Sequence, residues 1–450
     1  MNESSRIWLR ARALESKEEW QAAAAHLVKM SERFPSLAPL LAMDIERLNR
    51  TSNKSKPVNT NASGGDDKGL SRLVFVVGDL SAIGGIANRT RTVLTNCSGR
   101  LPEYFVFSRR HSREISLAHS LAWDKNPKEI ERAISEWDSN ETVFFLANNA
   151  LSLFPENIQE RVKKFPLVYI AAGQMAFIIQ DSPVLSNLDY VENFRASRII
   201  SFSDSDINFQ RQLGIHGQVK GFVPVAMRTA NGYRLSKNRY FGYVGRIDFH
   251  TKGCERLIDI AAEFKRLGMS SLRIFTTNGK NSPDLPRFLA MIKEHGLEGQ
   301  FVIEYNCEDK EVIFDQLRFL ILPSRKESFG NVVVEALSFG VPVLAASYAP
   351  GPAELVDHGQ SGLLLDDLSG DAVVQALCRL SDADLERMSA AAFERHKHFS
   401  IESHLDFLEE VAKEVLSRFD GQNRLPILPR LKVLDKLYAV QKTQKGKASV

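Results

Sequence analysis

Cysteine is scarce and scattered in this sequence. The 450 residues contain four cysteines, and no two of them form a C-x-x-C pair: they are Cys97, Cys254, Cys307 and Cys378. Disulfide frameworks and structural zinc sites need cysteines that are more numerous or more closely spaced. The pattern therefore predicts reduced thiols in a cytosolic protein, with neither a metal site nor a disulfide framework.

Long hydrophobic runs are also missing. A membrane-spanning helix needs about 18–20 apolar residues in succession, and no stretch of the chain reaches that length. The first residues, Met-Asn-Glu-Ser-Ser-Arg, include no apolar segment, so no signal peptide is expected. The formal net charge of +3 is too small to indicate nucleic-acid binding, but it suits an anionic ligand or a membrane surface. We expect a cytoplasmic protein.

Several common catalytic motifs are absent. The glycines that follow the first predicted strand do not form G-x-G-x-x-G, so a nicotinamide site is a poor fit. None of the ten histidines lies in a Ser/His/Asp or H-E-x-x-H frame. Other motifs indicate the function, and they can be placed only after the strands and helices of the chain have been predicted.

The chain shows a regular alternation of strand and helix patterns. Short apolar runs, typical of buried strands, lie between helical stretches in two series. The first series comprises 73–77, 104–107, 143–146, 167–170, 198–202 and 219–223, and the second comprises 240–244, 272–276, 301–304, 319–322, 341–346 and 362–365. This alternation predicts an α/β protein with two Rossmann-like, doubly wound parallel domains.

Composition divides the chain further. Residues 1–50 have apolar positions at helix-like spacing and predict a helical hairpin that docks on another surface, whereas the polar, turn-rich residues 51–70 predict a linker. The Rossmann-like domains are expected at 71–225 and 226–420. The tail, 421–450, interleaves basic and apolar residues. Two interpretations of this tail remain open: it lies in a membrane interface, or it packs on its own domain or stays disordered.

One run, 323–336, combines two carboxylates with a glycine turn. Its sequence is P-S-R-K-E-S-F-G-N-V-V-V-E-A, with an apolar strand before it and an apolar helix opening at the turn. In open α/β sheets, ligands bind beyond the carboxyl ends of the strands, and a helix N-terminus there offers N–H groups to phosphate. Glu327 and Glu335 can accept hydrogen bonds from sugar hydroxyls. The combination suits a nucleotide sugar, which has hydroxyls at both ends and a diphosphate between them.

This run resembles the E-x7-E signature of retaining glycosyltransferases of family 4 (glycosyltransferase group 1), which have the GT-B fold. The resemblance depends on the whole frame, P-S-x-x-E-x-F-G-x-x-x-x-E-A-x-x-x-G-x-P-V. It implies that Glu327 orients the donor sugar and that Glu335 holds the ribose hydroxyls. It also implies that the helix N-terminus contacts the donor through Phe329, Gly330, Asn331 and Val332.

A second motif, G-R-I-D followed by K-G, leaves the first strand of the second series. It resembles the family's G-R-x-x-x-x-K-G element, which implies that Arg246 and Lys252 bind the donor diphosphate. A forked guanidinium and a compact ammonium both suit phosphate oxygens; a pair of solvated surface cations is the alternative. In the first domain, Gly84 and Gly85 resemble the family's Gly-Gly loop beside the donor and acceptor, with a plain strand-to-helix turn as the alternative.

Further candidates come from the same resemblance. The G-P-x-E stretch at 351–354 resembles a loop of family members that use UDP-sugars to build surface glycans. Many members have a histidine facing the donor sugar, and Gln174 stands near the matching position here, which leaves the sugar undetermined. Thr277 and Asn306 lie at strand ends, where the base sits in the family.

Taken over about residues 71–420, the resemblance implies a retaining, metal-independent glycosyltransferase without a cofactor. The expected reaction moves a sugar from a nucleotide sugar, favoured to be a UDP-sugar, to a glycan or lipid-linked acceptor in cell-surface polysaccharide synthesis. No nucleic-acid partner is expected, and the basic tail suggests peripheral binding at the inner face of the membrane. Two alternatives stay open: a GT-B epimerase or phosphorylase, and a non-catalytic scaffold that uses its N-terminal helices.

Overall fold

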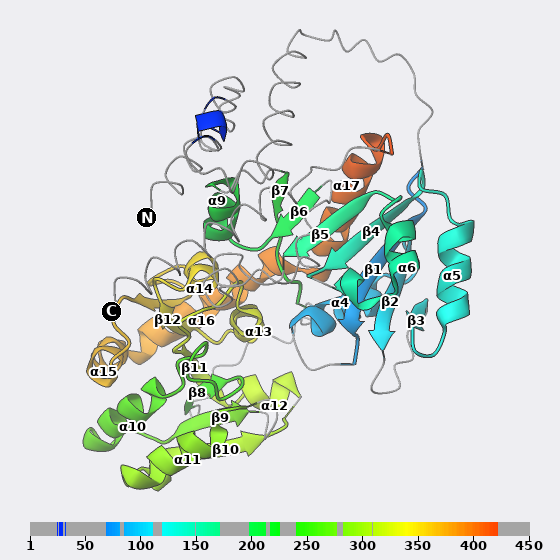
Figure 1. Cartoon of the computed structure of the whole chain (residues 1–450). Coiled ribbons are helices and arrows are strands. Elements are labelled where there is room, and N and C mark those ends of the chain that lie inside the picture. The colour runs from blue at the N-terminus through cyan, green and yellow to red at the C-terminus, as the bar shows by residue number, and fades with distance from the viewer. Residues whose placement is uncertain are drawn as a thin grey trace. The chain divides into compact units, whose positions relative to one another are not determined.

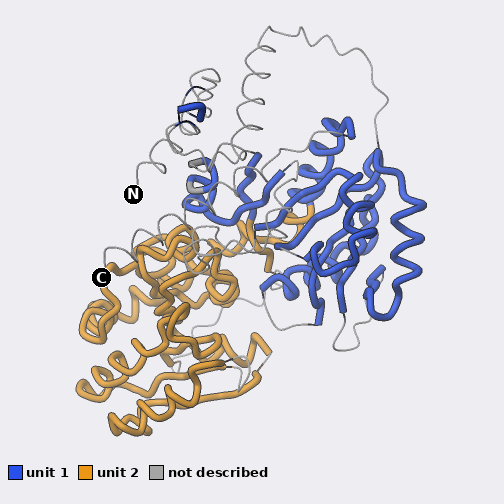
Figure 2. The backbone as a smooth tube through the Cα atoms, viewed as in Figure 1, with its two compact units in different colours: residues 1–221, 406–450 blue, residues 222–405 orange. Residues whose placement is uncertain are grey.

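The chain divides into two compact units, which Figure 2 draws in two colours. The first comprises residues 1–221 and 406–450, and the second comprises residues 222–405. The computed structural model describes residues 25, 27–29, 32, 69–81, 85–110, 119–148, 150–171, 198–212, 217–225, 240–276, 282–307 and 309–421. Most of the predicted hairpin, nearly all of the predicted linker and the basic tail beyond Gly421 lie outside these residues.

The first unit contains a seven-stranded sheet in the order β3-β2-β1-β4-β5-β6-β7 (Figure 1). Every pairing in it is parallel. Its strands are β1 (Arg72–Asp79), β2 (Glu103–Arg110), β3 (Ser120–Ala122), β4 (Thr142–Ala147), β5 (Leu167–Ala171), β6 (Arg198–Ser201) and β7 (Gln218–Lys220). The described helices are α4 (Gly85–Asn96), α5 (Pro127–Glu136), α6 (Glu156–Val162), α9 (Asp204–Gln212) and the short 3-10 helix η2 (Ala150–Leu153).

The second unit contains a six-stranded parallel sheet in the order β10-β9-β8-β11-β12-β13. Its strands are β8 (Tyr240–Val244), β9 (Leu272–Thr276), β10 (Phe301–Tyr305), β11 (Leu317–Leu322), β12 (Val343–Ala346) and β13 (Gly362–Leu365). The helices are α10 (Arg256–Arg266), α11 (Leu285–Glu294), α12 (Lys310–Phe314), α13 (Asn331–Ser338), α14 (Pro350–Leu355), α15 (Gly370–Cys378) and α16 (Asp382–His396), with the 3-10 helices η5 (Glu298–Gln300) and η6 (Lys397–Phe399).

The central strands are apolar along almost their whole length because helices cover parallel sheets on both faces. All six residues of β4 are buried, as are all four of β12 and five of the six of β11. The interior of the first unit is rich in aromatic rings, with Phe144 and Tyr169 fully buried. This continuous burial explains why apolar runs alone predict the strands.

Each sheet reverses its direction of growth between two central strands. In the second unit the chain runs from β8 outward to β10 and then returns to β11 beside β8, from where it continues to β13. The loops that leave β8 and β11 therefore emerge side by side at the carboxyl edge, on a topological switch point where ligands of such sheets bind. The first sheet has its own switch point between β1 and β4.

The predicted α/β class with two doubly wound parallel sheets is confirmed. Strand β3 was not predicted, because its three residues, Ser-Leu-Ala, form no apolar run. The run predicted from residue 341 begins pairing only at Val343, since Pro342 has no N–H to give to the ladder.

The last helix, α17 (Ile401–Ser417), is divided between the units after residue 405. The strand and helix pattern of the sequence predicts that all of 226–420 forms the second domain. Ion pairs explain the difference: Arg100 Nε donates to Glu409 Oε1 at 2.8 Å, and Arg198 Nε donates to Glu414 Oε2 at 3.1 Å. Tyr104 adds a hydrogen bond to Glu409 at 2.8 Å, so the second part of α17 belongs with the first sheet.

Candidate active site

Two loops meet at the β8/β11 switch point. The loop after β8 carries Arg246 and Lys252, and the loop after β11 carries Glu327. The backbone N–H groups of Arg325 and Lys326 both donate to the carbonyl oxygen of Thr251, at 2.9 and 3.1 Å. These bonds fix the two loops to each other at the carboxyl edge of the sheet.

Glycine permits this close approach. Gly253 has a φ of +61°, and a Cβ atom there would lie 2.4 Å from the carbonyl oxygen of Pro323. A larger residue would therefore be strained in its backbone and would push the loops apart. The residue next to it is Lys252, so the position of that ammonium depends on this glycine.

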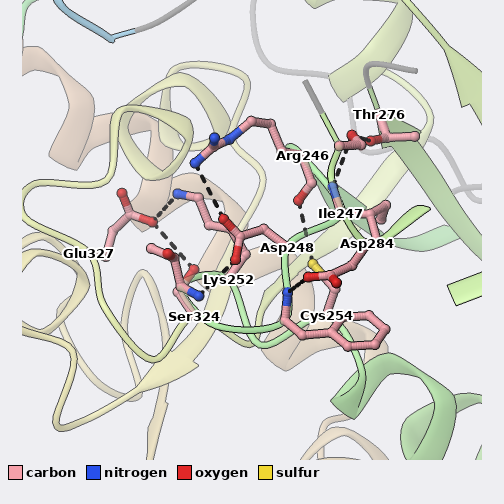
Figure 3. Close-up of polar contacts among 12 residues, drawn as sticks. Arg246, Ile247, Asp248, Lys252, Cys254, Thr276, Asp284, Ser324 and Glu327 are labelled. Atoms are coloured by element: carbon pink, nitrogen blue, oxygen red, sulfur yellow. Dashed lines mark hydrogen bonds and ion pairs between the residues drawn. The ribbon is translucent and has the colours of Figure 1, made fainter. Parts of the chain in front are cut away.

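Buried hydrogen bonds hold the loop that carries Arg246. The hydroxyl of the fully buried Tyr243 donates to the carbonyl oxygen of Arg246 at 2.6 Å. The backbone N–H of Ile247 donates to Ser282 Oγ at 3.1 Å, and that of Phe249 donates to Asp284 Oδ2 at 2.7 Å. These bonds preorganise the loop, and Figure 3 shows the one at Ile247 and the one that Asp284 accepts.

Burial also keeps two side chains that contact this loop, Tyr243 and Cys254, protonated. It raises the pKa of the Tyr243 hydroxyl well above its usual range and that of the Cys254 thiol to about 11. The thiol donates to the carbonyl oxygen of Arg246 at 3.5 Å. Cys254 is therefore a protonated structural group at neutral pH.

Lys252 and Glu327 form an ion pair in the centre of the site. Lys252 Nζ lies 2.5 Å from Glu327 Oε2, and the two side chains are only 20% and 14% exposed. Ser324 Oγ donates to the same carboxylate oxygen at 3.3 Å. Sequence reasoning named Lys252 and Glu327 for separate tasks but did not predict that they pair, and it did not name Ser324, which stands in the matching P-S-x-x-E frame.

Arg246 is the more accessible of the two predicted phosphate ligands. Its side chain is 50% exposed, and Nη2 lies 3.5 Å from Asp248 Oδ2. In Figure 3 the guanidinium of Arg246 and the ammonium of Lys252 both extend toward Glu327. Asp248 is itself held, since its Oδ1 accepts from the N–H of Thr251 at 2.8 Å. An anion at this edge would meet two cations held by one short loop.

Helix α13 opens directly after the glutamate loop. Its N-cap, Gly330, has a φ of +94°, and a Cβ atom there would lie 3.3 Å from Glu327 Cγ. Within α13, only Asn331, Val332 and Glu335 are not buried. The helix therefore presents its N-terminal N–H groups and one carboxylate, a turn further along, on the same side.

The turn between Glu327 and helix α13 packs against Gly351, at the start of α14. Phe329 is buried, and its backbone packs so closely on Gly351 that a Cβ there would lie 2.3 Å from the Phe329 carbonyl oxygen. The N–H of Gly351 donates to the carbonyl oxygen of Glu327 at 3.1 Å. The G-P-x-E stretch thus has a structural task beside Glu327.

Glu335 has a partner that the sequence did not reveal. Lys310 Nζ, from the first residue of α12, lies 2.9 Å from Glu335 Oε2. The two residues are separated by 25 positions, and no sequence spacing predicts that they meet.

The remaining predicted residues are placed as follows. Asn306 follows β10 with a φ of +55°, and its N–H donates to the Thr276 carbonyl oxygen at 2.9 Å. Gly85 is the first residue of α4 in the first unit. Gly84, Gln174 and Thr277 lie outside the described residues. The structure thus brings Arg246, Lys252 and Glu327 together.

The described ranges contain neither a metal-binding cluster nor a membrane-spanning helix. No group of three or more His, Cys, Asp or Glu side chains among these residues is arranged to hold a metal ion. Within the same ranges, no helix combines the length and hydropathy that crossing a bilayer requires.

Solved structures define the class of fold. The HepE protein (Alr3699) of Anabaena, crystallised with UDP, aligns with a TM-score of 0.59 at 18% identity, covering 75% of this chain and 98% of that one. At this identity the likeness concerns the fold alone. The architecture of two Rossmann-like domains is that of GT-B enzymes.

One protein family matches the second unit in sequence. The family described as Glycosyl transferases group 1 matches residues 231–395. The matched residues include Arg246, Lys252, Glu327 and Glu335, so the match agrees with the resemblance predicted from the E-x7-E run.

Curated relatives cover the same region. The exopolysaccharide phosphotransferase SCO2592 of Streptomyces coelicolor is 29% identical over 157 residues, which are 34% of this chain and 16% of the relative. A D-inositol 3-phosphate glycosyltransferase of Corynebacterium aurimucosum is 32% identical over 184 residues, which are 39% of this chain and 43% of the relative. The chain spans less than half the length of either relative.

Proposed function

We propose that this protein is a retaining glycosyltransferase that moves a sugar from a UDP-sugar to a glycan or lipid-linked acceptor. The observation that carries the proposal is the meeting of Arg246, Lys252 and Glu327 beside the N-terminus of α13 at the β8/β11 switch point. Cations and helix N–H groups suit a diphosphate, and a carboxylate beside them suits the hydroxyls of the attached sugar.

The proposed chemistry is a substitution on one face of the donor sugar. The acceptor hydroxyl oxygen bonds to the anomeric carbon while the bond from that carbon to the diphosphate oxygen breaks. The departing phosphate takes the hydroxyl proton, so no protein base is needed. Arg246, Lys252 and the N–H groups of α13 stabilise the charge that develops on the leaving group, and Glu327 orients the sugar. Glu335 holds the ribose.

Metal independence is part of the proposal. Two cations in fixed loops can neutralise the leaving diphosphate in the way that a divalent ion does elsewhere. Lys252 is well placed for this because its side chain is only 20% exposed, and charge interactions strengthen as water is excluded.

The UDP donor and the surface-polysaccharide role are supported by the comparisons. HepE was crystallised with UDP, and the name of one curated relative refers to an exopolysaccharide. The proposal therefore includes a role in the synthesis of a cell-surface polysaccharide, and it places the reaction at the cytoplasmic face of the membrane because the basic tail suits an anionic surface.

A donor screen tests the proposal. Thermal shift with UDP-, GDP- and ADP-sugars should single out a UDP-sugar, and NMR of the transfer product should show an anomeric configuration identical to that of the donor. Glu327→Ala should lose turnover by orders of magnitude, whereas Lys293→Met, on the exposed side of α11, should not. Interconversion of the donor without any acceptor would indicate an epimerase instead, and binding of no nucleotide sugar would contradict the proposal.

A further inference from the structure

Arg89 is the only buried arginine or lysine in the part of the chain that the structure describes. It is 6% exposed and lies in the second turn of α4, in the first unit. Burial lowers the pKa of its guanidinium to about 10, so the group stays charged at neutral pH. A buried charge needs an opposite charge or hydrogen-bond acceptors to offset the water that it has lost.

The described residues supply neither of these to Arg89. Its Nη2 atom is fully buried and has no hydrogen-bond partner. Its recorded neighbour is Phe202, whose ring centre lies 4.9 Å from the guanidinium carbon. Stacking on a ring holds a guanidinium in place, but it leaves the N–H groups in the guanidinium plane free to donate to oxygen atoms.

Other arginines that stack on aromatic rings show what is missing here. Four of them pair with a carboxylate, and their side chains are 22–29% exposed, so they are also better hydrated than Arg89. These pairs are Arg72–Glu141, Arg273–Glu304, Arg318–Asp382 and Arg395–Asp357. A structural role as a stacked cation therefore does not explain why Arg89 has no carboxylate partner among the described residues.

The guanidinium of Arg89 lies at the carboxyl edge of the first sheet. Phe202 directly follows Ser201, the last residue of β6, and α4 is the helix that follows β1. All strands of this sheet pair in parallel, so β1 and β6 end at the same edge. Ligands of such sheets bind at this edge.

The two acids at the start of α9, close to Phe202 in the chain, have other partners. Asp204 Oδ2 lies 2.6 Å from Lys220 Nζ, and Asp206 Oδ2 accepts from Gln210 Nε2 at 2.7 Å. Neither carboxylate is recorded within ion-pair distance of Arg89. The described residues thus leave the guanidinium without an anion at an edge where ligands bind.

We propose that Arg89 binds a phosphate or carboxylate group and that this group belongs to the acceptor. The assignment to the acceptor rests on the proposed function, in which the donor diphosphate is bound by Arg246 and Lys252 of the second unit. A second anion site then remains for the other substrate. A guanidinium donates two parallel N–H···O bonds to either group, which fixes its orientation as well as its position. The acceptor is therefore a phosphorylated or acidic molecule.

Titration of the full chain with inorganic phosphate tests the inference. Saturating UDP fills the donor site throughout, and potassium chloride keeps the ionic strength constant. Arg89→Met should weaken phosphate binding at least about tenfold, because hydrogen bonds to charged groups are the strong ones. Arg89→Lys should keep part of the affinity, since it retains the charge but loses the fork. A parallel titration with acetate distinguishes a phosphorylated acceptor from a carboxylated one.

Urea unfolding without added phosphate separates binding from a structural role. Methionine keeps an apolar contact with Phe202 and removes an unpaired buried charge, so Arg89→Met should be at least as stable as wild type. Its affinity for UDP should equal that of wild type, because the donor is assigned to the second unit. The matched control is Arg132→Met, which removes a 75% exposed arginine of the first unit and should leave phosphate binding unchanged.

The outcomes are distinct. A wild type that binds UDP but neither phosphate nor acetate would overturn the inference and leave the proposed function standing. An Arg89→Met variant that fails to fold, or that keeps the wild-type affinity for phosphate, would do the same. Equal losses of UDP and phosphate affinity in Arg89→Met would overturn the assignment to the acceptor. If wild type binds no nucleotide, the proposed function fails, whereas phosphate binding that depends on Arg89 would still support the anion site.

Discussion

The ion pair between Lys252 and Glu327 allows a prediction that separates stability from turnover. Lys252→Met removes the ammonium that lies 2.5 Å from Glu327 Oε2. The glutamate then keeps one described partner, Ser324 Oγ at 3.3 Å, while its side chain remains only 14% exposed. Exposed pairs contribute about 0–1 kcal/mol, and breaking a fully buried pair costs about 3–5 kcal/mol. This intermediate site should lose about 1–2 kcal/mol of unfolding free energy.

Neutralising both partners should reverse that loss. Glu327→Gln alone leaves the lysine unpaired, whereas the double variant Lys252→Met/Glu327→Gln leaves no unpaired charge. The unfolding free energy of the double variant should therefore be about 1–2 kcal/mol higher than the value expected if the losses of the two single variants simply added. Turnover should behave differently. Removal of one preorganised donor costs about 10²–10³-fold in turnover, and the double variant should be at least as slow as Lys252→Met.

Urea unfolding and single-turnover transfer measure the two quantities, with Lys293→Met as the control for loss of a lysine. Additive losses of unfolding free energy would show that the two side chains do not stabilise each other. Turnover of Lys252→Met within threefold of wild type would remove this lysine from the leaving-group site and refute the reasoning.

Glycosyl transfer should survive EDTA, and loss that Mn²⁺ restores would contradict the proposed charge neutralisation. Tyr243→Phe should lower the unfolding free energy by about 1–2 kcal/mol, measured by urea unfolding, because the Arg246 carbonyl loses its buried 2.6 Å donor. Gly253→Ala should slow turnover much more than Gly268→Ala, since both glycines have a positive φ but only the first would overlap a facing carbonyl. A chain ending at Gly421 should sediment less with anionic vesicles than the full chain, and equal sedimentation would exclude the tail as a membrane contact.

The strands were predictable because burial on both faces leaves a simple signal. Runs such as those of β4 and β11 are almost wholly apolar, so their positions follow from composition within a few residues. The three-residue β3 has no such signal. The order of the strands in each sheet could not be predicted from the sequence, because strands such as β8 and β11 pair although they are far apart in the chain.

The candidate site was predictable only where its residues stand in a contiguous motif. The frames around Glu327 and Arg246 identify the loops, and the fold brings those loops together. The partners of the two glutamates were less accessible to sequence reasoning. Lys252 stands 75 positions from Glu327, and the Lys310–Glu335 contact depends on where a short helix begins.

Lys252 and Lys310 pair the two glutamates of the E-x7-E run with opposite charges. Each glutamate is paired with a lysine from a different loop: Glu327 with Lys252 after β8, and Glu335 with Lys310 after β10. The loop after β11 is thereby joined to the loop after β8, and helix α13 is joined to the start of α12. Because Lys252 faces Glu327 and Arg246 lies 3.5 Å from Asp248, a diphosphate must compete with these carboxylates for the two cations, while the N–H groups of the helix add positive potential. A nucleotide sugar that engages both glutamates must then exchange hydrogen bonds with two existing ion pairs, which favours ligands that carry hydroxyls at both ends.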